Sequence, residues 1–88
     1  MDIELRNINL ENVSLSDQVS KVKEEDQEFL NAVRYEEEEH AIEEFWDKVQ
    51  SSLGLLYKMR GITADEVMSG YKYHLEKIKN RKKKKKEW

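Results

Sequence analysis

Residues 42–68, IEEFWDKVQSSLGLLYKMRGITADEVM, contain most of one helix, the signal that stops it and the start of the next. Apolar residues recur in the first half of this stretch at intervals of three and four positions, which predicts an amphipathic helix. Gly61 ends that helix, because glycine readily adopts the left-handed conformation of a C-cap. Thr63 and Glu66 then form the capping-box pattern that opens another helix. The stretch therefore predicts an all-α fold.

The sequence on either side extends this pattern to three helices. Ser14 followed by Asp17 is a further capping pattern, so a first helix is expected to start at Ser14. The second helix is expected from about Glu37 to Arg60. Short connections between long helices favour antiparallel neighbours, which predicts a small antiparallel bundle. The predicted organisation is an irregular lead-in over 1–13, a helical domain over 14–81 and a basic disordered tail over 82–88.

Each predicted helix carries an apolar face that is expected to be buried. The chain has only 88 residues, of which 38% are hydrophobic, so a single copy has little material for a core. We therefore expect self-association to complete the bundle. The residues expected to form the three faces are Leu15, Val19, Val22, Phe29, Leu30 and Val33, then Ile42, Phe45, Trp46, Val49, Leu53 and Leu56, and finally Val67, Met68, Tyr71, Leu75 and Ile78.

Composition excludes several classes of protein. The chain has no cysteine, which excludes disulfides and thiolate zinc sites, and its two histidines, His40 and His74, lack the spacing of a zinc hydrolase. No apolar run approaches the ~18 residues of a membrane span, and the acidic N-terminus does not resemble a signal peptide. A soluble protein of the cytoplasm, without a membrane partner, is expected.

Charge is distributed unevenly along the chain. Residues 1–47 hold fifteen acidic and four basic residues, a balance of −11, whereas residues 48–88 hold four acidic and twelve basic residues, a balance of +8. An acidic half suits divalent cations and a basic half suits phosphates, so the two together suit a metal-bound nucleotide. The alternative is that the two halves simply neutralise each other within one bundle.

Four carboxylates stand out because of their spacing. Glu25 and Glu28 are three residues apart, as are Glu44 and Asp47, and residues at this spacing share a face of a helix. Two antiparallel helices would bring these pairs opposite each other. Hard divalent cations such as Mg²⁺ prefer oxygen ligands of this kind. The alternative is a solvated acidic surface, which is common in a chain with nineteen acidic residues.

The complete acidic pattern is EExxE at Glu24, Glu25 and Glu28, fifteen intervening residues, and ExxD at Glu44 and Asp47. The chain resembles the MazG-like family of all-α nucleoside triphosphate pyrophosphohydrolases. The resemblance rests on this acidic pattern and on the segments around it, which are in order DQVSKVKEEDQEFLNAV, AIEEFWDKVQSSLGLL and GITADEVMSGYKYHLEKIKNR. The resemblance covers residues 14–81. Within the family, the chain resembles the short, single-domain members found in bacteria and their phages.

This resemblance implies an enzyme that hydrolyses nucleoside or deoxynucleoside triphosphates to monophosphates and pyrophosphate. It also implies a homodimer or homotetramer with a Mg²⁺ cofactor, for which Mn²⁺ is an alternative. The residue roles that it implies are metal ligation by Glu25, Glu28, Glu44 and Asp47, catalysis by Glu24, phosphate binding by Lys77, Asn80 and Arg81, and weaker substrate contact by Gln18 and Lys21.

Two features depart from the family pattern. Asp26 occupies a position where an apolar or aromatic residue is expected, and the run Lys82–Lys86 has no counterpart. A non-catalytic helical module, which binds a partner protein or senses nucleotides, is the alternative function. No nucleic-acid partner is expected, although the lysine run offers electrostatic contact with one.

Overall fold

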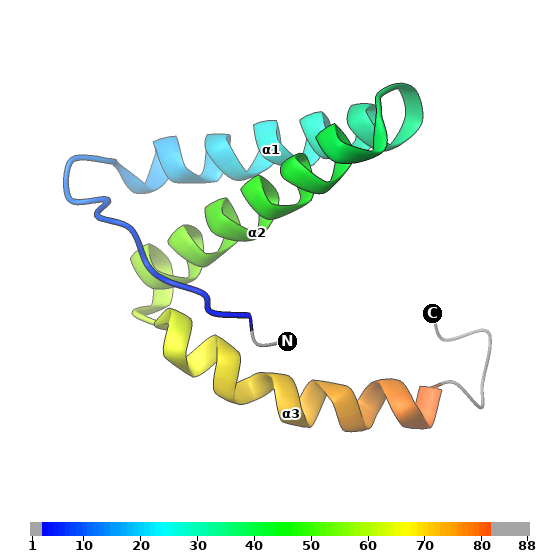
Figure 1. The fold of residues 1–88 in the computed structure, drawn as a ribbon. Helices are drawn as coiled ribbons and strands as arrows, with labels where there is room; N and C mark the ends of the chain where they lie inside the picture. The colour runs from blue at the N-terminus through cyan, green and yellow to red at the C-terminus, as the bar shows by residue number, and fades with distance from the viewer. Residues whose placement is uncertain (1–2, 82–88) are drawn as a thin grey trace.

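The structure is a computed structural model that describes residues 3–81. Its three helices are α1 (Leu15–Tyr35), α2 (Glu38–Arg60) and α3 (Ala64–Arg81), and the described residues contain no strand (Figure 1). The predicted all-α class is therefore confirmed. The basic tail predicted for residues 82–88 lies outside the described residues. No helix between residues 3 and 81 is both long enough and apolar enough to cross a membrane.

The helix ends follow the capping residues of the sequence. The Ser14 hydroxyl accepts a hydrogen bond from the Asp17 backbone N–H at 3.0 Å and so caps α1. Gly61 ends α2 with a φ of 68°, in the left-handed region that only glycine adopts without strain. Thr63 and Glu66 exchange side chain to backbone hydrogen bonds at the start of α3. These boundaries confirm the sequence-based predictions.

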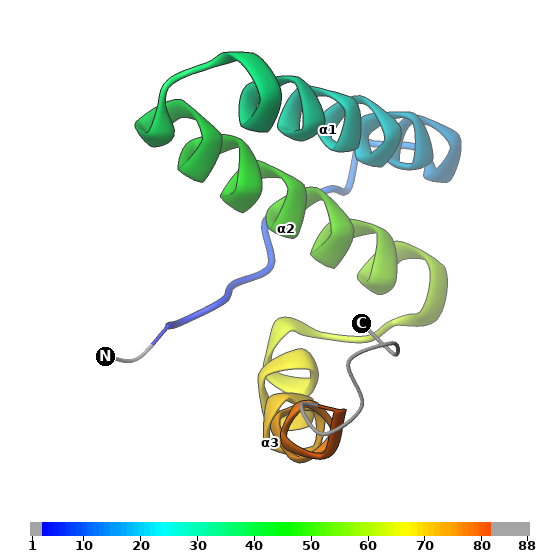
Figure 2. The same cartoon turned by 90° about the vertical axis from the view of Figure 1, so that its right-hand side faces the viewer.

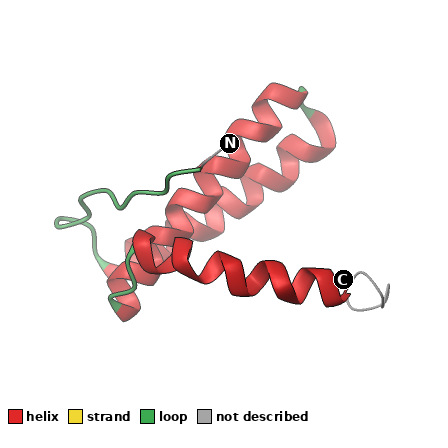
Figure 3. Cartoon of the chain, turned by 60° about the horizontal axis from the view of Figure 1, so that its bottom comes forward, coloured by secondary structure: helices red, strands yellow, loops and turns green. Residues whose placement is uncertain are grey.

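Helices α1 and α2 form an antiparallel hairpin, and α3 diverges from it (Figures 1 and 2). The hairpin helices pack along each other, whereas α3 turns away after Gly61 and has few contacts with either helix. A third view shows the same separation of α3 from the hairpin (Figure 3). The expected side-by-side packing of all three helices is therefore not present within one chain.

The segment before α1 has neither helix nor strand, and polar contacts tie it to the other elements. The Gln50 amide nitrogen donates to the Arg6 carbonyl oxygen at 2.9 Å. The Asn7 side-chain oxygen accepts a hydrogen bond from the Ala64 backbone N–H, also at 2.9 Å. The segment therefore bridges α2 and the start of α3.

The apolar faces are less buried than the sequence predicted. Trp46 and Tyr71, both expected in the core, are 42% and 58% exposed. None of the five apolar residues expected to be buried on α3 is buried in the single chain. The physical reason is the divergence of α3, which leaves its apolar face without a helix to cover it. The described apolar residues that are buried are Ala32, Leu53 and Ala64.

An apolar groove occupies the angle between α2 and α3. It has a volume of about 840 Å³ and lies beside the start of the N-terminal segment. Phe45 and Trp46 line it from α2, Met68 and Tyr71 line it from α3, and Ile3 closes one side. We refer to it below as the α2–α3 groove.

Candidate metal centre

Close packing of α1 on α2 sets the positions of the acidic residues. The buried Gln18 amide nitrogen donates to the Ser51 carbonyl oxygen at 2.8 Å and so links the two helices. Gly54 lies beside this link, where an added Cβ would come within 2.7 Å of the same amide nitrogen. Ser51 and Gly54 are therefore small because α1 approaches closely here. Ser51 is itself buried at this contact.

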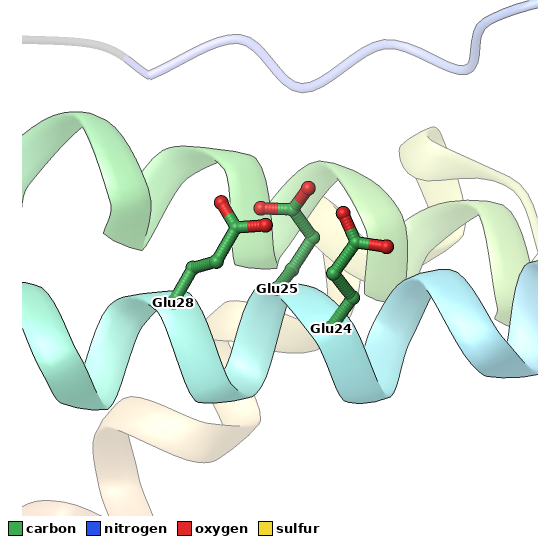
Figure 4. A group of neighbouring side chains, drawn as sticks. All are labelled: Glu24, Glu25 and Glu28. Atoms are coloured by element: carbon green, nitrogen blue, oxygen red, sulfur yellow. The ribbon is translucent and has the colours of Figure 1, made fainter.

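The acidic residues of the two helices converge on one place. Glu24, Glu25 and Glu28 extend from the same side of α1 (Figure 4), and each offers an oxygen within 4.8 Å of the others. Glu25 also belongs to a second group, in which its carboxylate and those of Glu44 and Asp47 on α2 meet the same limit. Glu25 therefore joins the two halves of the sequence motif, and we refer to these five residues as the carboxylate cluster.

Two oxygens of the cluster are buried without a partner. Glu25 is only 5% exposed, and its Oε1 receives Lys21 Nζ at 2.7 Å, but its Oε2 has no hydrogen-bond partner among the described residues. Oε2 of Glu44 is likewise buried and has no hydrogen-bond partner among the described residues. Buried carboxylate oxygens are costly unless something neutralises them. These two oxygens could serve as ligands of a cation.

Electrostatic crowding affects Glu28, one member of the cluster. The pKa of Glu28 is raised above its usual value, first by desolvation, and then by the charge of Glu25, a hydrogen bond with Glu24 and the charge of Glu44. The pKa of Lys21 is also raised, chiefly by its hydrogen bond to Glu25. Negative charge is therefore in excess here, and a second cation besides Lys21 would be favoured.

His40 was not assigned a role from sequence, yet it contacts the cluster. Its Nε2 lies 3.0 Å from Oε1 of Glu44, and its Nδ1 lies 3.4 Å from Oε1 of Glu36. The pKa of His40 is raised, first by the hydrogen bond to Glu44 and then by the charge of Glu36. The signal was its spacing of four residues from Glu44, which places the two on one face of α2, whereas Glu36 reaches His40 from the connection between α1 and α2.

We expect the stability of the metal-free protein to reflect this contact. Because the folded-state pKa of His40 is raised, its protonation stabilises the fold. The contribution is fully present below the unfolded pKa of about 6.5 and disappears as pH rises through the folded pKa. His40→Gln should therefore lower the melting temperature more at pH 5.5 than at pH 8.5. An equal loss at both pH values in thermal melts would show that the imidazolium charge does not stabilise the fold.

The donor set fits a hard divalent cation. All five side chains of the cluster offer carboxylate oxygen, the ligand type that Mg²⁺ and Mn²⁺ take from proteins. The unpartnered oxygens of Glu25 and Glu44 provide free coordination capacity on both helices. Neither histidine nor cysteine belongs to the cluster, which disfavours zinc.

Asp26, which departs from the family pattern, lies beside the cluster without joining it. Its Oδ1 is 3.5 Å from Lys48 Nζ, close enough for an ion pair, although the two atoms do not form a hydrogen bond. Lys48 also lies over the Phe29 ring, 5.1 Å from its centroid. The Asp26 carboxylate therefore has a cationic partner from α2.

A pocket of about 570 Å³ adjoins the cluster. Lys21, Glu25 and Asp47 line it together with residues of the N-terminal segment. Asn12 and Gln50 also line it. Sequence reasoning missed these two residues, because the segment shows no periodicity and Gln50 belongs to no motif.

The remaining predicted site residues do not all gather at the cluster. Glu24 is exposed and lies 3.8 Å from Lys21 Nζ, so it sits at the solvent side. Gln18 donates its amide to the contact between α1 and α2, which leaves its substrate role a prediction. Lys77 lies over the Tyr73 ring, 5.8 Å from its centroid, on the diverging α3. The structure does not bring the α3 positions Lys77, Asn80 and Arg81 to the cluster of the same chain (Figure 1).

Comparisons of the chain with protein-family models, with curated proteins and with solved structures found no match.

Proposed function

We propose that the protein is a Mg²⁺-dependent pyrophosphohydrolase that converts nucleoside or deoxynucleoside triphosphates into monophosphates and pyrophosphate. The observation that supports this proposal most is the convergence of Glu25 with Glu44 and Asp47, two of whose buried oxygens have no partner. The resemblance to the MazG-like family adds support, because the two halves of its acidic motif lie together in space. A cytoplasmic location follows from the proposed substrates.

The carboxylate cluster has two roles in this proposal. Glu25, Glu28, Glu44 and Asp47 would hold Mg²⁺, which would supply positive charge to offset that of the phosphate oxygens. Glu24, at the solvent side of the cluster, accepts the proton of the attacking water. The water oxygen bonds to the α-phosphorus, the bond from that phosphorus to the α–β bridging oxygen breaks, and its electron pair leaves with pyrophosphate.

Phosphate binding in this proposal needs a second copy of the chain. The last ten residues of α3, 72–81, contain four basic residues and one acidic residue, whereas residues 24–47 contain eleven acidic residues and one basic residue. These two stretches lie on separate arms of the open structure (Figure 1). A homodimer or homotetramer would place the basic arm of one copy against the acidic arm of another. Lys77, Asn80 and Arg81 would then bind the phosphates of a substrate held by the partner.

The α2–α3 groove supports the same assembly. Its aromatic residues remain 41–58% exposed, although aromatic side chains usually contribute most to burial. The three aromatic side chains Phe45, Trp46 and Tyr71 alone leave roughly 300 Å² exposed, which is already as large as the largest apolar patch of many monomers. A surface of this kind is typical of an interface, and the shortage of buried residues within one chain favours a second copy as its occupant.

The experiment that tests the activity is a pyrophosphate-release screen with standard and modified nucleotides in the presence of Mg²⁺. Release from at least one nucleotide, and its loss on chelation, is the expected result. The non-catalytic module predicts no release. A parallel thermal melt distinguishes binding from inertness, because a ligand at ~100 times its Kd adds ~2.7 kcal/mol of stability. In a domain this small, that addition raises the melting temperature by roughly 10 °C.

Truncation after Arg81 should leave turnover within a few-fold of the full chain at physiological ionic strength. The proposed ligands and phosphate contacts all precede residue 82, and the charges of the lysine run act at a distance that salt screens. Steady-state kinetics of the truncated and full-length proteins at two salt concentrations would test this. A hundredfold loss would instead place phosphate-binding residues within Lys82–Lys86.

A further inference from the structure

We infer that the pocket beside the carboxylate cluster receives the nucleoside part of the substrate, and that the side-chain amides of Asn12 and Gln50 recognise the edge of its base. This inference rests on the proposed function and deepens it, because it identifies the surface that selects among nucleotides. Neither residue belongs to the acidic motif, and the segment that carries Asn12 precedes the first helix.

The pocket lies beside the proposed metal ligands. Glu25 and Asp47 belong both to the carboxylate cluster and to the lining of the pocket, and Lys21, which pairs with Glu25, also lines it. A triphosphate held at the cluster therefore has its nucleoside end within reach of this pocket. The α2–α3 groove lacks this property, because none of the five cluster residues lines it.

The pocket is lined by both apolar side chains and side-chain amides. Ile8, Leu10 and Val13 give the pocket an apolar side against which the faces of a base can lie. The Asn12 side chain is exposed and makes no hydrogen bond within residues 3–81, so its amide can both donate to and accept from a ligand. Gln50 donates from Nε2 to the Arg6 carbonyl, which leaves its Oε1 as an acceptor. Side-chain amides of this kind pair with the edges of bases.

Contacts with α2 hold in place the part of the N-terminal segment that lines the pocket. Lys58 Nζ donates to the Leu10 carbonyl oxygen at 3.0 Å. The Leu10 side chain then lies so close to α2 that a Cβ at Gly54 would approach its Cδ1 to 2.7 Å. The pocket is therefore pre-formed rather than assembled around a ligand. Its volume of about 570 Å³ falls within the usual range for small-molecule sites, about 300–1,000 Å³.

Kinetic measurements with each of ATP, GTP, CTP and UTP and with their deoxy forms, all with Mg²⁺, test the inference. Asn12→Ala should lower kcat/KM about tenfold for the preferred nucleotide and less for the others, because it removes hydrogen bonds that only the preferred base makes. Asn31→Ala, an exposed asparagine of α1 outside the pocket, is the matched control and should change nothing. An equal loss for every nucleotide, or no loss, would overturn the inference.

Binding measured without turnover separates this inference from the proposed activity. Backbone amide resonances of residues 8–13 should shift on titration of the full chain with the same Mg²⁺-nucleotides, and Gly54→Ala should weaken that binding by displacing Leu10 or Gln18. Shifts at residues 8–13 without pyrophosphate release would leave the pocket assignment standing and refute the enzyme. Pyrophosphate release together with resonance shifts confined to the α2–α3 groove would support the enzyme and refute the pocket assignment. Absence of any nucleotide binding would refute both.

Discussion

Replacing Glu28 with glutamine, or Asp47 with asparagine, is expected to abolish pyrophosphate release while the fold remains intact. Loss of one ligand from a bound metal removes several kcal/mol of transition-state stabilisation, which corresponds to a hundredfold or greater loss in kcat. The apo variants should melt at the same temperature as the wild type or higher, because the raised pKa of Glu28 shows that its ionised form is disfavoured in the folded state.

The same variants should lose the stabilisation that Mg²⁺ gives to the wild type. Glu39→Gln is the matched control, since Glu39 is an exposed glutamate near the start of α2, outside the carboxylate cluster. Thermal melts with and without Mg²⁺, together with the pyrophosphate assay, measure both properties. Near-normal activity of Glu28→Gln would contradict the metal site, as would unfolding of the amide variants. A solvated acidic surface predicts effects no larger than that of Glu39→Gln.

Replacing Tyr71 with glutamate is expected to dissociate the assembly and, with it, to unfold the chain. Tyr71 is 58% exposed in the single chain and lines the α2–α3 groove. If a second copy covers that area, burial of Tyr71 contributes about 2–4 kcal/mol per copy. Its loss from both copies of a dimer would weaken association roughly a thousandfold or more.

Tyr73→Glu provides the matched control on the same helix. Tyr73 is 74% exposed and does not line the groove, so its replacement should change stability by only about ±0.5 kcal/mol. Sedimentation equilibrium, and thermal melts over a range of protein concentrations, measure the two variants beside the wild type. A wild-type chain that stays folded as a monomer at micromolar concentration would refute the proposed assembly, and so would identical behaviour of the two variants.

Local structure was predictable from the sequence because it depends on neighbouring residues. Ser14, Gly61 and the pair Thr63 and Glu66 act within one helical turn, and the structure places helix ends at each of them. The N-terminus of α2 was harder to place, because Glu37 makes no side-chain capping bond there. Spacing of three residues also predicted that Glu25 and Glu28 share a face, as do Glu44 and Asp47.

The carboxylate cluster was predictable in membership but not in geometry. Antiparallel packing implied that the two acidic pairs face each other. However, the sequence could not reveal that Glu25 is the member common to both groups, or that it is buried. These properties depend on how closely α1 approaches α2 at Ser51 and Gly54. Periodicity indicates which face of a helix is turned inward, but it gives neither the distance to the partner helix nor the register.

The sequence by itself determined an all-helical chain, its helix ends and the two acidic faces, because each of these follows from contacts within a few residues. Only the tertiary structure decided the divergence of α3 and the position of the N-terminal segment over the hairpin. The apolar face of α3 carries the pattern of a buried helix, yet that pattern cannot say whether the covering surface belongs to the same chain. Asn12 and Gln50 reach one pocket because side chains of α2 donate hydrogen bonds to backbone carbonyls more than forty positions away, such as Gln50 to Arg6. Such contacts leave no periodic trace in a single sequence.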